Sequence, residues 1–242
     1  RGACQSSRRE LWKLAAMAPR TIAVVSKPDH PALEVLPSSD DIKFLIANDM
    51  STFSSFPDLD KVEAIVWIPP GNVETLVALY QKVPVKWFHS FSAGVDGIAG
   101  FLKDHLLETD TNVTNGKGAF SHSLAEYTMA ACLHFNKKIP VLQANKQAHK
   151  WDQYKMPVVT GKSIGFLGFG DIAKATAKMA KSAFGMKTYA LRRNAGKSQA
   201  DAELLDHTFD LATEKLELFK QCDYVVSILP GTPETRHFTS TA

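Results

Sequence analysis

Cysteine, long apolar runs and an excess of charge of one sign are all scarce in this sequence. Its 242 residues include three cysteines, Cys4, Cys132 and Cys222, which lie far apart and form no C-x-x-C pair. Neither a disulfide framework nor a zinc site is therefore indicated. A transmembrane helix needs about 20 consecutive apolar residues, whereas Lys, Asp or Gly interrupts the apolar segments here. We expect no membrane partner and no metal site.

The balance of charge excludes a further class of function. Basic residues number 28 and acidic residues 25, which gives a formal net charge of +3. Nucleic-acid binding requires a basic patch or stripe, and we find none. We expect a cytoplasmic protein. An organelle is the alternative, because residues 1–17 contain several Arg and Ser and are compatible with a targeting remnant as well as with a gene-model extension.

Short β-rich runs alternate with helical stretches along the chain. The runs are nearly continuous in Ile, Val, Phe and Trp, as in parallel strands that are covered on both faces. They occupy residues 21–26, 42–49, 62–68, 85–91, 163–168, 186–191 and 222–230. This rhythm predicts an α/β fold with one domain over residues 18–115 and a second over 116–242. A long helix is predicted from Ser121 to Lys138, because Leu124, Tyr127 or Thr128, Ala131 and Phe135 recur at helical spacing.

A glycine motif stands between a predicted strand and a predicted helix. Gly168, Gly170 and Ala173 form G-x-G-x-x-A directly after the apolar run. In this context the first glycine permits a tight turn and the second leaves room for a pyrophosphate. Asp171 and Ile172 would then present free backbone N–H groups to the phosphates. The motif predicts a dinucleotide site.

Two arginines follow the next predicted strand. Arg192 and Arg193 lie where an acid usually accepts hydrogen bonds from the adenosine ribose, about 20 residues past the motif. A guanidinium at this place would instead pair with a 2′-phosphate. NADP(H) is therefore predicted over NAD(H). The alternative is that both side chains are solvated at the end of the strand.

With these motifs in order, the chain resembles the D-isomer-specific 2-hydroxyacid dehydrogenases, and most of all their glyoxylate/hydroxypyruvate reductase branch. The resemblance spans residues 18–238. It rests on SAGVDGI, NGKGAFSHSLAEY, TGKSIGFLGFGDIA and LPGTPETRH, together with Trp151. It implies a flavodoxin-like substrate domain followed by a Rossmann dinucleotide-binding domain, and a homodimer formed largely through the nucleotide domains and the helix that enters them.

The resemblance also assigns roles to individual residues. It implies that backbone N–H groups at Ala93 and Gly94 bind the substrate carboxylate. An ordinary turn capped by Asp96 is the alternative for these residues. It further implies that Leu229 and Pro230 line the nicotinamide side of the cofactor site, and Pro230 as a simple strand terminator is the alternative there.

Two departures from the family pattern are visible in the sequence. Ala173 occupies a motif position where Gly is common, and it is small enough to preserve close packing. Lys137 stands where many members have Arg, so any bidentate contact made there would be weaker.

The residues that the family uses for chemistry are not recognisable here. An Arg, a Glu and a His would lie downstream of LPGTPETRH, where only residues 238–242 remain. Candidate substitutes have no acid at a spacing that indicates a partner, so we expect none to be catalytic; they are His89, His122, His134 and His237. We therefore expect the Rossmann domain to be incomplete at its C-terminus and this chain to be inactive by itself.

The leading hypothesis is an NAD(P)H-dependent reductase of a small 2-oxo acid, for which we take glyoxylate or hydroxypyruvate. One alternative is a non-catalytic dinucleotide-binding protein that resembles the corepressors related to these enzymes. Another is a stable but inactive truncated product. Catalytic residues encoded beyond Ala242 would favour the enzyme.

Overall fold

The computed structural model describes residues 19–83, 85–193 and 201–240. The expected extension at residues 1–17 lies outside this part of the chain. The protein divides into two compact units, one up to Gly116 and one from Lys117 onward. Within the described residues no helix is long and apolar enough to cross a membrane.

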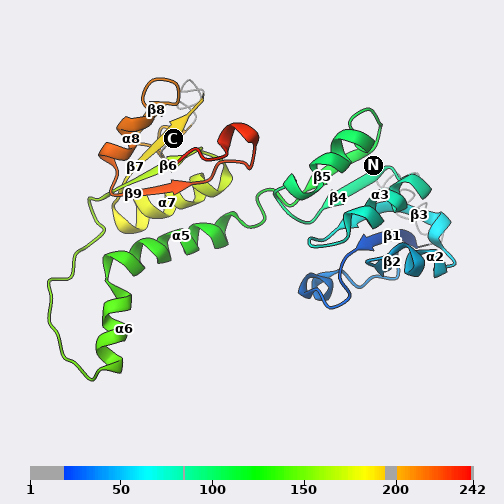
Figure 1. Cartoon of the computed structure of the whole chain (residues 1–242), viewed down its shortest axis with the longest axis horizontal. Coiled ribbons are helices and arrows are strands. Elements are labelled where there is room, and N and C mark those ends of the chain that lie inside the picture. The colour runs from blue at the N-terminus through cyan, green and yellow to red at the C-terminus, as the bar shows by residue number, and fades with distance from the viewer. Residues whose placement is uncertain (1–18, 84, 194–200, 241–242) are drawn as a thin grey trace, which may run out of the picture. The chain divides into compact units, whose positions relative to one another are not determined.

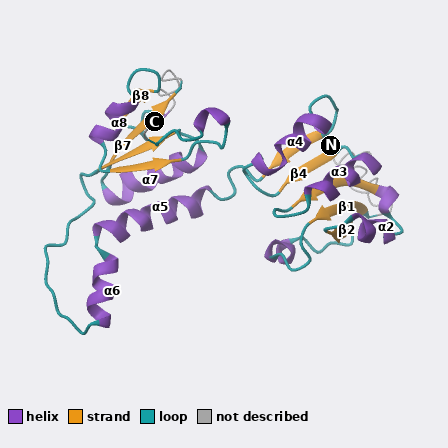
Figure 2. Ribbon diagram, viewed as in Figure 1, coloured by secondary structure: helices purple, strands orange, loops and turns teal. Residues whose placement is uncertain are grey.

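The first unit is a five-stranded parallel sheet with helices on its faces (Figures 1 and 2). Its strand order is β2-β1-β3-β4-β5, which is the flavodoxin-like order. The strands are β1 (Arg20–Val25), β2 (Ile42–Ala47), β3 (Val62–Trp67), β4 (Trp87–Ser90) and β5 (Asn112–Asn115). The helices are α2 (Met50–Ser55), α3 (Val73–Lys82) and α4 (Ala99–Phe101), the last continued by a π-helical turn at Leu102–Leu106.

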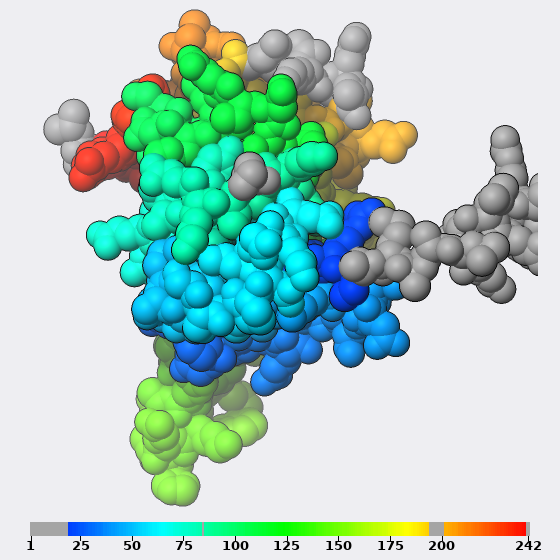
Figure 3. Space-filling view, turned by 90° about the vertical axis from the view of Figure 1, so that its right-hand side faces the viewer, coloured from blue at the N-terminus to red at the C-terminus, as the bar shows by residue number. Residues whose placement is uncertain are grey.

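The core of the first unit forms where these helices cover the sheet. Phe53 of α2, Leu76 of α3 and Phe88 of β4 are fully buried in one apolar cluster. Asn72 begins α3 by accepting a hydrogen bond from the Thr75 backbone at 2.8 Å. In the space-filling view the side chains of this unit form a continuous surface (Figure 3).

The second unit is a four-stranded parallel sheet with the order β8-β7-β6-β9. This arrangement is 3-2-1-4 in chain order, as in the first strands of a Rossmann fold. The strands are β6 (Ser163–Leu167), β7 (Lys187–Arg192), β8 (His207–Asp210) and β9 (Tyr224–Ser227), and the helices are α5 (Ser121–Asn136), α6 (Ile139–Gln147), α7 (Asp171–Phe184) and α8 (Lys215–Gln221). Every residue of β6 is buried. The α/β class and both predicted fold types are confirmed.

The long helix differs from its prediction in its length and in the face that it buries. α5 ends at Asn136, and after two residues α6 begins, with Pro140 in its first turn, a position that suits proline. α5 packs against α7 (Figure 1) through Ala125, Met129 and Cys132. The predicted face is wrong, because Leu124 and Phe135 are 41% and 72% exposed.

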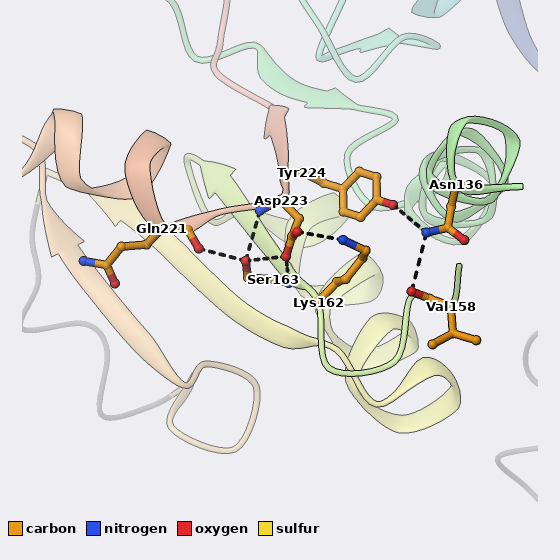
Figure 4. Close-up of polar contacts among 7 residues, drawn as sticks. All are labelled: Asn136, Val158, Lys162, Ser163, Gln221, Asp223 and Tyr224. Carbon is orange, nitrogen blue, oxygen red and sulfur yellow. Dashed lines mark hydrogen bonds and ion pairs between the residues drawn. The ribbon is translucent and has the colours of Figure 1, made fainter. Parts of the chain in front are cut away.

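Hydrogen bonds to two aspartates hold the amino ends of strands in the second unit. Asp223, just before β9, accepts a hydrogen bond from the Ser163 backbone at 2.8 Å and pairs with Lys162 at 2.8 Å (Figure 4). Asp206, just before β8, accepts a hydrogen bond from the Thr188 backbone of β7 at 2.8 Å. Each carboxylate therefore satisfies a donor that the parallel ladder leaves open at the start of a strand.

The Asp223 network predicts a pH-dependent contribution to stability. Hydrogen bonds from Lys162 and the Ser163 backbone hold the pKa of Asp223 below its usual value, against the effect of burial. A depressed folded-state pKa contributes stability that is present above the unfolded-state pKa of about 3.9 and is lost as pH falls through the folded-state value. Asp223→Ala should lower the free energy of unfolding at pH 7 by about 1 kcal/mol, a small figure because the side chain is partly solvated.

Chemical denaturation at a series of pH values measures this effect, and the deficit of the variant should shrink below about pH 4. Asp152→Ala is the matched control, since Asp152 pairs with Lys150 at 2.9 Å on the surface, and it should change stability by less than about 0.5 kcal/mol. A deficit of Asp223→Ala that stays constant from pH 7 to pH 3 would contradict the ionic explanation.

Candidate functional site

The predicted glycine motif forms a tight turn between β6 and α7. Gly168 follows the strand with a φ of +84°, and its backbone N–H donates to the Leu191 carbonyl of β7 at 3.2 Å. Gly170 is the residue before α7, and no side chain caps this end of the helix. The first backbone N–H groups of α7 therefore face the space beyond the carboxyl edge of the sheet, where they can bind an anion.

Gly168 and Gly170 differ in the space that a side chain would have. A Cβ on Gly168 would lie 3.3 Å from the Ile228 carbonyl oxygen and 3.3 Å from Leu229 Cδ2. A Cβ on Gly170 would meet no heavy atom of the described residues within 4 Å. The fold thus requires Gly168, whereas the space beside Gly170 suits a group that approaches the backbone closely.

A cavity of about 500 Å³ opens beside this turn. It lies where the carboxyl ends of β6, β7 and β9 meet, which is the usual ligand position in open α/β sheets. Seven of the eight residues predicted to bind the cofactor line it, and these are Gly168, Gly170, Asp171, Arg192, Arg193, Leu229 and Pro230. The eighth, Ile172, is half-buried in the first turn of α7 and does not line the cavity.

Arg192 is held by its neighbours and is not solvated. Its side chain is 9% exposed and forms an ion pair with Asp201. Its guanidinium carbon lies 4.7 Å from the centre of the Phe169 ring, a cation–π distance. The alternative that both arginines are solvated is therefore wrong for Arg192, whereas Arg193 is exposed at the cavity.

Asp201 and Lys174 are two of the cavity residues that were not predicted from the sequence. Asp201 is 7% exposed, and its second carboxylate oxygen pairs with Lys174 of α7 at 2.9 Å. Lys174 is the fourth residue of α7, so its placement beside the motif could have been read from helical spacing. Asp201 lies in the connection after β7, and no local sequence pattern predicts its place at the cavity.

The remaining charged groups lie at the mouth of the cavity. Lys117 is 3.8 Å from Asp171. Hydrogen bonding to Thr232 and the nearby Arg193 contribute to a pKa of Glu234 below its usual value. The lining therefore combines cations and anions, with the cations in slight excess.

The predicted substrate residues belong to the first unit. Ala93 and Gly94 are exposed in the turn after β4, and Asn115 donates from its amide to the Ala93 carbonyl at 2.8 Å. This hydrogen bond uses the Ala93 carbonyl and not the backbone N–H groups of the turn. The alternative that Asp96 caps the following turn is wrong, because no side chain caps it.

The histidines and cysteines of the described residues do not line the cavity. Within the described part of the chain no histidine lines it, and no cluster of His, Cys, Asp or Glu could hold a metal ion. His89 is on β4, hydrogen-bonded to Thr114 at 2.8 Å, and burial lowers its pKa. Burial raises the pKa of the Cys222 thiol to about 11, which makes it a poor nucleophile at neutral pH.

The contrast between the glycines gives a prediction about stability. Gly168→Ala should lower the free energy of unfolding by about 1 to 3 kcal/mol, because its positive φ disfavours a side chain. Gly170→Ala should change it by less than about 0.5 kcal/mol. Thermal or chemical denaturation of both variants measures the difference. Equal losses would show that the space beside Gly170 is not open.

Comparison with known proteins agrees with this geometry. Residues 129–242 match the family model described as "D-isomer specific 2-hydroxyacid dehydrogenase, NAD binding domain". The D-3-phosphoglycerate dehydrogenase of Methanocaldococcus jannaschii is 33% identical over 217 residues, which cover 88% of this chain and 39% of that protein. The chain thus spans about two fifths of the length of this relative.

Solved structures share the fold. A D-isomer specific 2-hydroxyacid dehydrogenase family protein from Aeromonas salmonicida has a TM-score of 0.68 at 25% identity, over 91% of this chain and 67% of the other. An NADPH-dependent glyoxylate/hydroxypyruvate reductase from Sinorhizobium meliloti, in complex with NADP and sulfate, has a TM-score of 0.66 at 18% identity, over 90% and 64%. The glycine turn, the cavity beside it and these matches show that the chain belongs to the D-isomer-specific 2-hydroxyacid dehydrogenase family.

Proposed function

We propose that this chain binds NADP(H) in preference to NAD(H) and is part of a reductase of a small 2-oxo acid. In this proposal residues 18–115 form the substrate domain and residues 116–242 belong to the dinucleotide-binding domain. The observation that carries the proposal is the open space at Gly170, which adjoins both the N-terminus of α7 and the buried Arg192. A dinucleotide needs a close backbone approach at one point and a partner for its ribose at the other.

The residues present fit a nicotinamide dinucleotide. Gly168 and Gly170 would admit the pyrophosphate, and the backbone N–H groups of Asp171 and Ile172 would bind it at the helix N-terminus. Leu229 and Pro230 would flank the nicotinamide end. When bound, the nicotinamide supplies a hydride for reduction of a carbonyl.

The preference for NADP(H) rests on the side chains at the end of β7. Arg192 lies in the cavity and Arg193 at its exposed side, so either guanidinium can pair with a 2′-phosphate. An unmodified ribose gains no comparable charge-assisted hydrogen bond. The NADP complex of the Sinorhizobium meliloti protein supports the same choice.

For the substrate we propose glyoxylate or hydroxypyruvate, bound through its carboxylate by the backbone at Ala93 and Gly94. A small-residue turn with exposed N–H groups suits an anion. The name of the Sinorhizobium meliloti reductase supports this choice, whereas the name of the Methanocaldococcus jannaschii relative points to a phosphorylated hydroxy acid.

The cofactor proposal is tested by affinity. Wild-type chain should bind NADPH about tenfold more tightly than NADH, because one charge-assisted hydrogen bond contributes roughly 1.5 kcal/mol or more. Arg192→Asp should remove this preference, since the new carboxylate repels the phosphate, and Arg193→Ala should reduce it. Fluorescence titration of each dinucleotide against the wild type and the two variants measures all six dissociation constants.

Gly170→Val is the control for the position of the site, because its Cβ would meet no heavy atom of the described residues within 4 Å and its methyl groups would occupy the space proposed for the pyrophosphate. It should abolish binding of both dinucleotides and leave the melting temperature unchanged.

We also expect no oxidation of NADPH with glyoxylate by this chain alone, since no described histidine lines the cavity. Equal affinity of the wild type for NADPH and NADH would refute the preference.

We further propose that two copies associate through α5 and α6. Tyr127 and Phe135 of α5 are 73% and 72% exposed, and Val141 of α6 is 48% exposed. Apolar groups exposed together on neighbouring elements are typical of protein interfaces. Light scattering should give a dimer for the wild type and a monomer for Phe135→Asp with Val141→Asp, and a monomeric wild type at micromolar concentration would overturn this proposal.

A further inference from the structure

Asp201 occupies a position in the cofactor cavity that the proposed function leaves unexplained. Its side chain is 8% exposed, and its carboxylate lies between two cations, with Arg192 on one oxygen and Lys174 on the other. All three side chains line the cavity. The acid therefore neutralises the two groups that would otherwise be most useful to a bound phosphate.

The charge of Asp201 persists at neutral pH. Burial raises the pKa of this carboxyl, but the hydrogen bonds from Arg192 and Lys174 outweigh it, and the pKa lies below its usual value. The pair is also well buried on the arginine side, where 9% of the side chain is exposed. Interactions between such poorly solvated charges are screened little by salt.

Arg192 retains capacity for a ligand despite this pair. Among the described residues, its Nη1 atom is buried and has no hydrogen-bond partner. The guanidinium carbon lies over the Phe169 ring, 4.7 Å from its centre. A buried donor without a partner is costly, so a ligand oxygen that reached it would gain more than one that met a solvated arginine.

We propose that Asp201 is a specificity-determining residue, which orients Arg192 in the cavity and competes with the 2′-phosphate of the cofactor for Arg192 and Lys174. This inference rests on the proposed function and deepens it. A phosphate that pairs with Arg192 comes within a few ångströms of the Asp201 carboxylate and is repelled by it. The unphosphorylated ribose brings no such charge, so Asp201 limits the preference for NADP(H) and lets NAD(H) compete.

The chain offers a matched control in a second ion pair of the same kind. Lys181 pairs with Asp206 at 2.9 Å, as Lys174 pairs with Asp201 at 2.9 Å. Both lysines lie on α7 and both acids lie between β7 and β8. Lys181 and Asp206 do not line the cavity, so Asp206→Asn removes a second, more exposed Lys–Asp pair on the same helix without changing the charge around the cofactor.

The experiment compares the dissociation constants of NADPH and NADH for the wild type, Asp201→Asn and Asp206→Asn by fluorescence titration. We expect Asp201→Asn to bind NADPH about tenfold more tightly, which corresponds to about 1.4 kcal/mol, and to bind NADH within about twofold of the wild type. Asp206→Asn should change neither constant. In 0.5 M salt the gain for NADPH should decrease but not vanish.

Lys174→Gln provides an independent test that survives if Asp201→Asn does not fold. Because it leaves Asp201 less compensated, it should weaken NADPH severalfold and NADH much less. Unchanged or weaker NADPH binding by folded Asp201→Asn overturns the proposal while the cofactor preference stands. Loss of NADH binding by that variant would also overturn it, because Asp201 would then be a ribose acceptor. A wild type that binds neither dinucleotide refutes the proposed function itself.

Discussion

The second unit depends on one backbone constraint, which is the positive φ of Gly168 at the end of the fully buried strand β6. This turn reverses the chain so that α7 starts at the edge of the sheet and packs on it through small residues such as Ala173 and Ala177. The cavity, the free N–H groups of α7 and the approach of Lys174 to Asp201 all follow from the position of this helix. A side chain at Gly168 would press on the Ile228 carbonyl and disturb them together.

Much of this architecture could be predicted from local patterns, because β1, β3 and β6 are apolar runs and the glycines follow a strand directly. Both parallel sheets and the position of the glycine turn agree with the sequence. The short strands β5 and β8 could not be predicted, since each has four residues and carries polar side chains. Their pairing with a neighbouring strand, and not an apolar pattern, defines them.

The details of the site show where sequence reasoning stops. Arg192 was found because its distance from the glycine motif is characteristic, but its ion pair was not, because Asp201 lies in a connection without regular spacing. The face of α5 was assigned to its largest apolar residues, whereas close packing against α7 selects Ala125, Met129 and Cys132. Large apolar side chains such as Phe135 stay exposed on the other face. Both the ion pair of Arg192 and the buried face of α5 depend on contacts between residues that are distant in the sequence or belong to another element.

The two lysine–aspartate pairs have a mechanical consequence for α7. Lys174 and Lys181 are two helical turns apart, about 10 Å along the axis, and both are fastened to the same connection between β7 and β8. A helix held at two separated points resists tilting as well as sliding. Any rearrangement of this unit around a ligand would therefore move α7 together with Asp201 and Asp206, and the N-terminal end of the helix would keep its distance from Arg192.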